Sequence, residues 1–108
     1  MAQDFTRYIA RDTGTSGATI FTANSNDAIT SIRLANITAS GITADVFLTV
    51  SSADYYLVKS VSMPAGSSIE LIDGGSRIVV ASGDALKVDC NTNSALDVWV
   101  SVVDAISA

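Results

Sequence analysis

Hydrophobic and polar residues alternate along much of this chain of 108 residues, most regularly in two segments. In residues 43–51 every second position is aliphatic, and the opposite phase includes Phe47. Residues 96–104 show the same alternation, with Trp99 in the opposite phase. A period of two places successive side chains on opposite faces of a strand. Each segment therefore predicts a half-buried antiparallel strand.

Weaker matches to the same template recur at roughly ten-residue spacing and are separated by Gly, Pro, Asn, Asp and Ser turns. They are residues 5–10, 18–23, 29–37, 55–61, 68–72, 77–81 and 85–90. Eight or nine short strands at this spacing indicate a sandwich or barrel. We expect an all-β fold, an antiparallel β-sandwich of jelly-roll or immunoglobulin-like topology.

The beginning of the chain differs from the rest. Residues 1–17 combine a short amphipathic stretch, which includes Phe5 and Tyr8, with a Gly/Ser/Thr-rich segment that has the composition of a linker. We expect an N-terminal arm and linker over residues 1–17 and a single β-sandwich domain over residues 18–108.

Composition supports a β fold and argues against chemistry. Ser and Thr account for 25 of the 108 residues, whereas Glu occurs once and Lys twice. Histidine, the most usual general base and metal ligand, is absent from the sequence. The sequence therefore predicts a non-enzymatic protein without a metal or cofactor.

Charge and hydropathy limit the partners. The formal net charge is −5, and the six basic residues are scattered along the chain, which disfavours nucleic acid as a partner. The apolar runs are far shorter than the roughly 20 residues that a spanning helix needs, so we expect no membrane segment. The first residues lack the features of a signal peptide, and we expect the chain to stay in the cytoplasm where it is made.

Candidate chemical sites have simpler structural interpretations. The acids Asp45, Asp97, Asp104 and Glu70 alternate with apolar residues, as solvent-facing strand positions do. Cys90 lies in an inward phase and is expected to be a buried hydrophobe. The sequence Asn36-Ile37-Thr38 matches a glycosylation site but is expected to be the end of a strand.

The more informative residues are aromatic side chains in the outward phase, Phe47 and Trp99, with Val103 following Trp99 on its face. One interpretation is that the N-terminal arm covers them, with Phe5, Tyr8 or Phe21 packing on top. Another is a protein interface, since exposed aromatic residues are typical of interface hot spots. A third is an aromatic platform for a ligand. The candidate interface residues are Phe5, Tyr8, Phe47, Trp99 and Val103.

Four segments carry a resemblance to a known group of proteins: residues 54–59 (DYYLVK), 63–71 (MPAGSSIEL), 82–88 (SGDALKV) and 96–102 (LDVWVSV). In this order they resemble small β-sandwich structural proteins in the virions of tailed bacteriophages, cyanophages especially. Such proteins build capsid decorations, neck or tail adaptors and fibre attachments. The resemblance implies a virion protein, assembled in the host cytoplasm.

Within that group we expect a capsid decoration, or cement, protein that binds the outer surface of the head and stabilises it. Its expected partners are the major capsid protein or other virion proteins and further copies of itself, with a trimer favoured. The alternatives are a neck, tail or baseplate adaptor or a fibre-attachment protein. A carbohydrate- or receptor-binding module, with Trp99, Tyr55 and Tyr56 stacking on sugar rings, is a further alternative.

Overall fold

A computed structural model describes residues 4–15, 17–72 and 78–104 of the chain. Its described residues form nine strands and no helix, which confirms the all-β prediction. The strands are β1 (Asp4–Thr13), β2 (Ala18–Thr22), β3 (Asp27–Asn36), β4 (Ile42–Val50), β5 (Ala53–Met63), β6 (Ser68–Glu70), β7 (Ile78–Val80), β8 (Ala85–Cys90) and β9 (Leu96–Asp104). No helix long and apolar enough to cross a membrane occurs in this described part of the chain.

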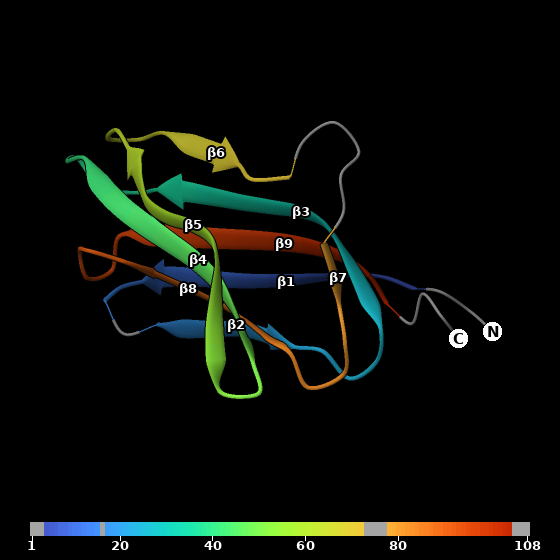
Figure 1. The fold of residues 1–108 in the computed structure, drawn as a ribbon. Coiled ribbons are helices and arrows are strands. Elements are labelled where there is room, and N and C mark those ends of the chain that lie inside the picture. The colour runs from blue at the N-terminus through green and yellow to red at the C-terminus, as the bar shows by residue number, and fades with distance from the viewer. Residues whose placement is uncertain (1–3, 16, 73–77, 105–108) are drawn as a thin grey trace.

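The strands form two antiparallel sheets packed face to face (Figure 1). The first sheet has the order β1-β9-β3-β6, with β7 also paired to β3, and the second has the order β2-β8-β4-β5. The chain changes sheet at most connections, and among consecutive strands β4 and β5 form a paired hairpin. This order is that of a jelly roll rather than of an immunoglobulin domain. The topology that periodicity left open is therefore decided.

The core lies between the sheets and is built from alternate residues of each strand. In β9, Val98, Val100 and Val102 are at most 2% exposed, as the alternation predicts. In β4, Val46 faces the core and Phe47 lies in the opposite phase, on the side of Asp45. Val46 and Phe47 are nevertheless both buried, and the pairing of β4 with β5 shifts register on both sides of Val46.

The expected N-terminal arm is wrong for the described residues, because Asp4–Thr13 forms β1. This strand pairs with β9 from Asp4↔Asp104 to Thr13↔Leu96 and closes one edge of the first sheet. The ring of Tyr8 faces inward and stacks on Phe21, with 4.5 Å between ring centroids and 11° between planes. An edge strand has one neighbouring strand and buries few residues. Its alternation of hydrophobic and polar residues is therefore weak and resembles that of a segment outside the sheet.

The β4–β5 hairpin turns through two residues, Ser51 and Ser52, between the paired residues Val50 and Ala53. Both serines have positive φ, 51° and 68°, the conformation that a two-residue hairpin with a type I′ turn requires. The structure thus confines the loop between the predicted strands 43–51 and 55–61 to Ser51 and Ser52.

Asn36 joins the end of β3 to two loops and is only 2% exposed. Its amide nitrogen donates to the carbonyl oxygens of Ser40, Met63 and Pro64 at 2.9, 3.1 and 3.1 Å. Its amide oxygen accepts from the backbone N–H and the hydroxyl of Thr38. The glycosylation match is thus a buried structural residue at the end of a strand, as expected.

Candidate interaction surfaces

The solvent side of the first sheet is called the first outer face here. Strand pairing brings Ile9, Trp99 and Arg33 into one row across β1, β9 and β3, and Arg7 and Ser101 into the next. The outward side chains of this face are Phe5, Arg7, Ile9, Arg11, Ser31, Arg33, Ala35, Glu70, Asp97, Trp99, Ser101 and Val103.

Large apolar side chains remain open on this face. Phe5 is 88% exposed, Ile9 53% and Trp99 48%. The guanidinium carbon of Arg7 lies 5.4 Å from the centroid of the Trp99 ring, a cation–π contact that holds the indole in place. A groove of about 410 Å³ lies beside Trp99, with Ala35 among its lining residues. The face therefore offers an ordered aromatic residue next to an apolar hollow.

Arginines gather on the same face. Arg7, Arg11 and Arg33 all project from it, although the chain as a whole carries a net charge of −5. Arg11, Arg33 and Asp97 line the groove beside Trp99. The basic residues that look scattered in the sequence are thus partly collected by strand pairing.

Glu70 has a structural role at the edge of this face. One carboxylate oxygen accepts from the Ser31 hydroxyl at 2.6 Å, and the other accepts from the backbone N–H groups of Ile32 and Ile72 at 2.8 and 3.3 Å. The Arg33 guanidinium lies 3.9 Å from the first oxygen. Where β6 ends, the Glu70 carboxylate therefore accepts hydrogen bonds from backbone N–H groups in place of carbonyl oxygens. It is a structural ligand of the backbone, not the freely solvated carboxylate expected from its phase.

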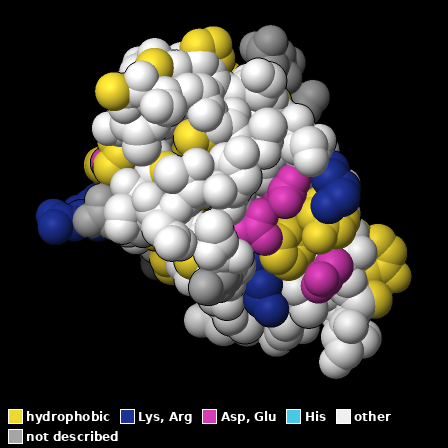
Figure 2. Space-filling model, turned by 90° about the vertical axis from the view of Figure 1, so that its left-hand side faces the viewer, with side chains coloured by type: hydrophobic (Ala, Val, Ile, Leu, Met, Phe, Trp, Pro, Cys, Tyr) yellow, Lys and Arg dark blue, Asp and Glu magenta, His cyan; other side chains and the backbone are white. Residues whose placement is uncertain are grey.

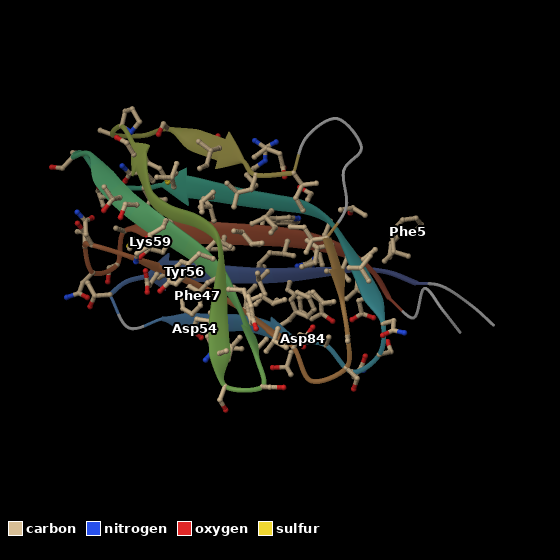
Figure 3. The ribbon with its side chains drawn as sticks, viewed as in Figure 1. Phe5, Phe47, Asp54, Tyr56, Lys59 and Asp84 are labelled. Atoms are coloured by element: carbon tan, nitrogen blue, oxygen red, sulfur yellow. The ribbon has the colours of Figure 1, made fainter. Side chains whose placement is uncertain are left out.

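The second outer face is the solvent side of β2, β8, β4 and β5, and its aromatic residues cover one another. The rings of Phe47 and Tyr56 lie 5.0 Å apart, and the Lys59 ammonium lies 4.5 Å from the centroid of Tyr56 (Figure 3). The Phe47 ring also approaches Gly17, within 3.9 Å of where a Cβ atom would stand. Phe47 is consequently only 6% exposed.

Two carboxylates face each other on this second face, where Asp45 of β4 and Asp89 of β8 are directly paired. Partial burial, the hydrogen bond to Asp45 and the charge of Asp45 together raise the pKa of Asp89 to about 6. For Asp45, partial burial opposes ionisation, but the Ser60 N–H at 2.6 Å, the bond to Asp89 and the charge of Lys59 outweigh it and lower its pKa. Figure 2 shows this face at the right, where acidic and basic side chains surround an apolar patch.

The structure places the candidate interface residues at different sites rather than on one surface. Phe5, Trp99 and Val103 share the first outer face, and Phe5 and Val103 are directly paired. Tyr8 points toward the core, and Phe47 lies covered on the opposite sheet. The interface role of the three residues on the first outer face remains a prediction, whereas Tyr8 and Phe47 are not open surface residues.

Sequence analysis missed the pairing of Asp45 with Asp89 and the clustering of the arginines. Both depend on strands distant in the chain, so only the pairing of β4 with β8, and of β1 with β9 and β3, could have revealed them. Within the described residues no group of three or more His, Cys, Asp or Glu side chains could hold a metal ion. Cys90 is 6% exposed and lies 3.0 Å from the carbonyl oxygen of Thr92, a buried position as predicted.

No protein-family model matches the chain, and no curated protein matches its sequence. Two solved structures share its fold. One is a protein of the Bacillus endospore appendages, described as a novel family of disulfide-linked pili, at 16% identity and a TM-score of 0.56, over 98% of this chain and 88% of that one. The other comes from the Gx strain of infectious bursal disease virus, at 10% identity and a TM-score of 0.52. That match covers 98% of this chain but 32% of the viral chain, and at these identities both matches show the fold alone.

Proposed function

We propose that this chain is a non-enzymatic structural subunit of a bacteriophage virion, a capsid decoration or cement protein that binds the outer surface of the head and stabilises it. Its partners would be the major capsid protein and further copies of itself, with a trimer favoured. The observation that carries the proposal is the first outer face, where Phe5, Ile9 and Trp99 stay exposed beside three arginines on a rigid sheet. Exposed aromatic and arginine side chains are typical of protein interfaces.

The fold supports a structural role. Jelly rolls recur in viral capsids, although lectin domains and enzymes of the cupin type also use them. The two structures of similar fold come from a pilus and from a virus. The order of sequence segments that resembles tailed-phage virion proteins supports the narrower assignment to a phage head.

The test is the copy number of this polypeptide relative to the major capsid protein in purified virions, measured by quantitative mass spectrometry. A ratio near one, or a fixed simple fraction, is the result expected for a decoration protein. A handful of copies per particle would instead favour a neck, tail or fibre-attachment protein. Complete absence from the particles would overturn the virion assignment.

A matched pair of variants tests the face itself. Trp99→Asp places a charge beside the groove and should abolish binding to heads that lack this protein, because an unpaired charge buried in an interface is costly. Thr19→Asp is the control: Thr19 is exposed on β2 of the other sheet, away from the first outer face. Equal head binding by both variants would contradict a role for the Trp99 surface.

A carbohydrate-binding module is the second candidate, because a half-exposed Trp99 beside a groove is also a platform on which a sugar ring can stack. Binding of the purified protein to an array of bacterial surface glycans, lost in Trp99→Ala, would support it. An array without signal for the wild-type protein would remove this candidate.

A further inference from the structure

We infer that copies of this chain associate head to tail, with the tip of the β4–β5 hairpin of one copy seated in the groove beside Trp99 of the next. The hairpin tip is residues 51–56, all of which are exposed. The groove is the hollow of about 410 Å³ on the first outer face, lined in part by Ile9, Arg11, Arg33, Ala35, Asp97 and Trp99. The inference deepens the proposed structural role by naming the surfaces through which copies would meet.

The groove has the character of a receptor for an aromatic side chain next to a carboxylate. Its walls include Ile9, Ala35 and the Trp99 ring, and its margin carries the guanidinium groups of Arg11 and Arg33 and the carboxylate of Asp97. The Arg33 side chain is 57% exposed, and its contact with Glu70, at 3.9 Å, is long for a hydrogen bond. An arginine so placed retains donors for an incoming carboxylate, which a planar guanidinium binds with two parallel hydrogen bonds.

The hairpin tip supplies the matching chemistry. Asp54 is followed by Tyr55 and Tyr56, which are 60% and 44% exposed. The hydroxyl of Thr49 donates to one carboxylate oxygen of Asp54 at 2.8 Å, which orients the group while its second oxygen keeps its acceptor capacity. Asp54 is the one charged residue from residue 48 to residue 58 of the sequence, and the Lys59 ammonium lies over the ring of Tyr56.

The shape of the tip lowers the cost of docking. The two-residue loop at Ser51 and Ser52 holds the strands of the hairpin in register up to the pair Val50↔Ala53. A segment that is ordered before it binds loses less conformational entropy on binding. Figure 3 shows Asp54 on this hairpin, next to its turn.

Charge favours a second copy as the occupant. Copies of a chain with a net charge of −5 repel one another overall, so a contact that brings arginines onto a carboxylate gains attraction. The first outer face holds Arg7, Arg11 and Arg33 together with the acids Glu70 and Asp97, and the hairpin tip holds Asp54 as its charged residue. Contact between two unlike surfaces gains attraction that contact between like surfaces lacks.

In a head-to-tail arrangement each copy gives its hairpin to one neighbour and its groove to another, and such a contact is heterologous. A contact of this kind produces a ring when its rotation closes and a fibre when it does not. A ring of three copies would fit the expected trimer. A dimer with two-fold symmetry would instead require each copy to place its hairpin in the groove of the other.

The test uses two variants of the full chain, Trp99→Ala in the groove and Asp54→Lys on the hairpin tip, studied by sedimentation velocity. Wild-type protein should form oligomers as its concentration rises, and each variant alone should associate on the order of tenfold or more weakly. An equimolar mixture of the two variants should form dimers and nothing larger, because one copy keeps an intact hairpin and the other an intact groove.

The control is Val79→Ser, an exposed apolar residue elsewhere on the first sheet, which should associate like wild type. Circular dichroism melts establish that every variant is folded. Wild-type protein that stays monomeric, variants that associate like wild type, or a mixture that forms no dimers would each overturn the head-to-tail contact. None of these results concerns the presence of the polypeptide in virions, so the proposed function fails or survives separately by its copy number.

Discussion

Each outer face of the sandwich carries an aromatic residue in the outward phase of a strand, but the two residues differ in their exposure to solvent. On the second face Phe47 is 6% exposed, because Tyr56 packs on it and Lys59 packs on Tyr56. On the first face Trp99 is 48% exposed, and the Arg7 guanidinium lies 5.4 Å from the centroid of its ring. The phase of an aromatic residue along a strand therefore identifies its face, whereas its neighbours on adjacent strands decide whether that face is open.

Removing β1 should have the largest effect on the first outer face, because this strand carries Phe5, Arg7 and Ile9 of that face. Deleting residues 1–12 should abolish cooperative thermal unfolding, since β9 loses one of its two neighbouring strands and the stack between Tyr8 and Phe21 is lost. Differential scanning calorimetry would detect the loss. Deleting only residues 1–3, which precede β1, is the control and should leave the transition in place. A truncated protein that melts like wild type would restore the detachable arm.

Alanine substitutions compare the two aromatic residues directly. Phe47→Ala should lower the free energy of unfolding by about 3 kcal/mol, because a buried ring is replaced by a cavity. Trp99→Ala should lower it by less than about 1 kcal/mol, because half of the indole is already in water and a surface substitution costs little. Urea unfolding of both variants gives the two values. Equal losses would mean that Trp99 is as much a part of the packed structure as Phe47.

Substitutions at Glu70 and Arg33 test whether hydrogen bonds or charge stabilise the edge of the first outer face. Glu70→Ala should cost about 2 kcal/mol, because the N–H groups of Ile32 and Ile72 and the hydroxyl of Ser31 lose their acceptor. The matched variant Arg33→Ala should cost less than about 0.5 kcal/mol, since an exposed ion pair contributes little. The comparison is made by urea unfolding. A larger loss for Arg33→Ala than for Glu70→Ala would contradict this assignment.

The smallest expected effect concerns the paired carboxylates of the second face. Asp89 binds its proton more tightly in the folded protein, with a pKa of about 6 against an ordinary value of 3.8. Its contribution to stability is therefore complete below about pH 4 and is lost as the pH rises through about 6. The lowered pKa of Asp45 acts in the opposite sense, but below that range.

Asp89→Asn keeps an N–H donor for Asp45 at every pH, so this variant should not lose stability as the pH rises through about 6. Its thermal midpoint should exceed that of wild type at about pH 8 and approach it at about pH 4. Melts monitored by circular dichroism across this range give the comparison. Asp97→Asn on the first face is the control and should show no such crossover. Parallel pH profiles for wild type and Asp89→Asn would show that the pair does not titrate as described.

Strand positions were largely predictable from the sequence, and the reasons for the exceptions are physical. Residues 96–104 alternate cleanly because β9 is central, with β1 and β3 on either side and one face on the core. Residues 4–13 were assigned to an arm because an edge strand buries little. In β4, Phe47 lies in the outward phase but is buried, because Tyr56 of the neighbouring strand packs on it.

The candidate surface was predictable only in part. Trp99 and Val103 could be placed on one outward face from their phase alone, and Phe5 was named with them. The groove, with Arg11 and Arg33 beside Trp99, joins residues from three strands far apart in the chain. The spacing of residues within one strand does not show which residues of other strands lie beside them.

The sequence by itself determined the all-β class, the approximate strand positions and the inward or outward phase of most residues, because these follow from local alternation and turn chemistry. Only the tertiary structure decided the jelly-roll order, the inclusion of β1 in the first sheet, the pairing of Asp45 with Asp89 and the exposure of Trp99 beside three arginines. These features depend on which distant strands become neighbours. That choice is made by the packing of the whole core and not by any single segment.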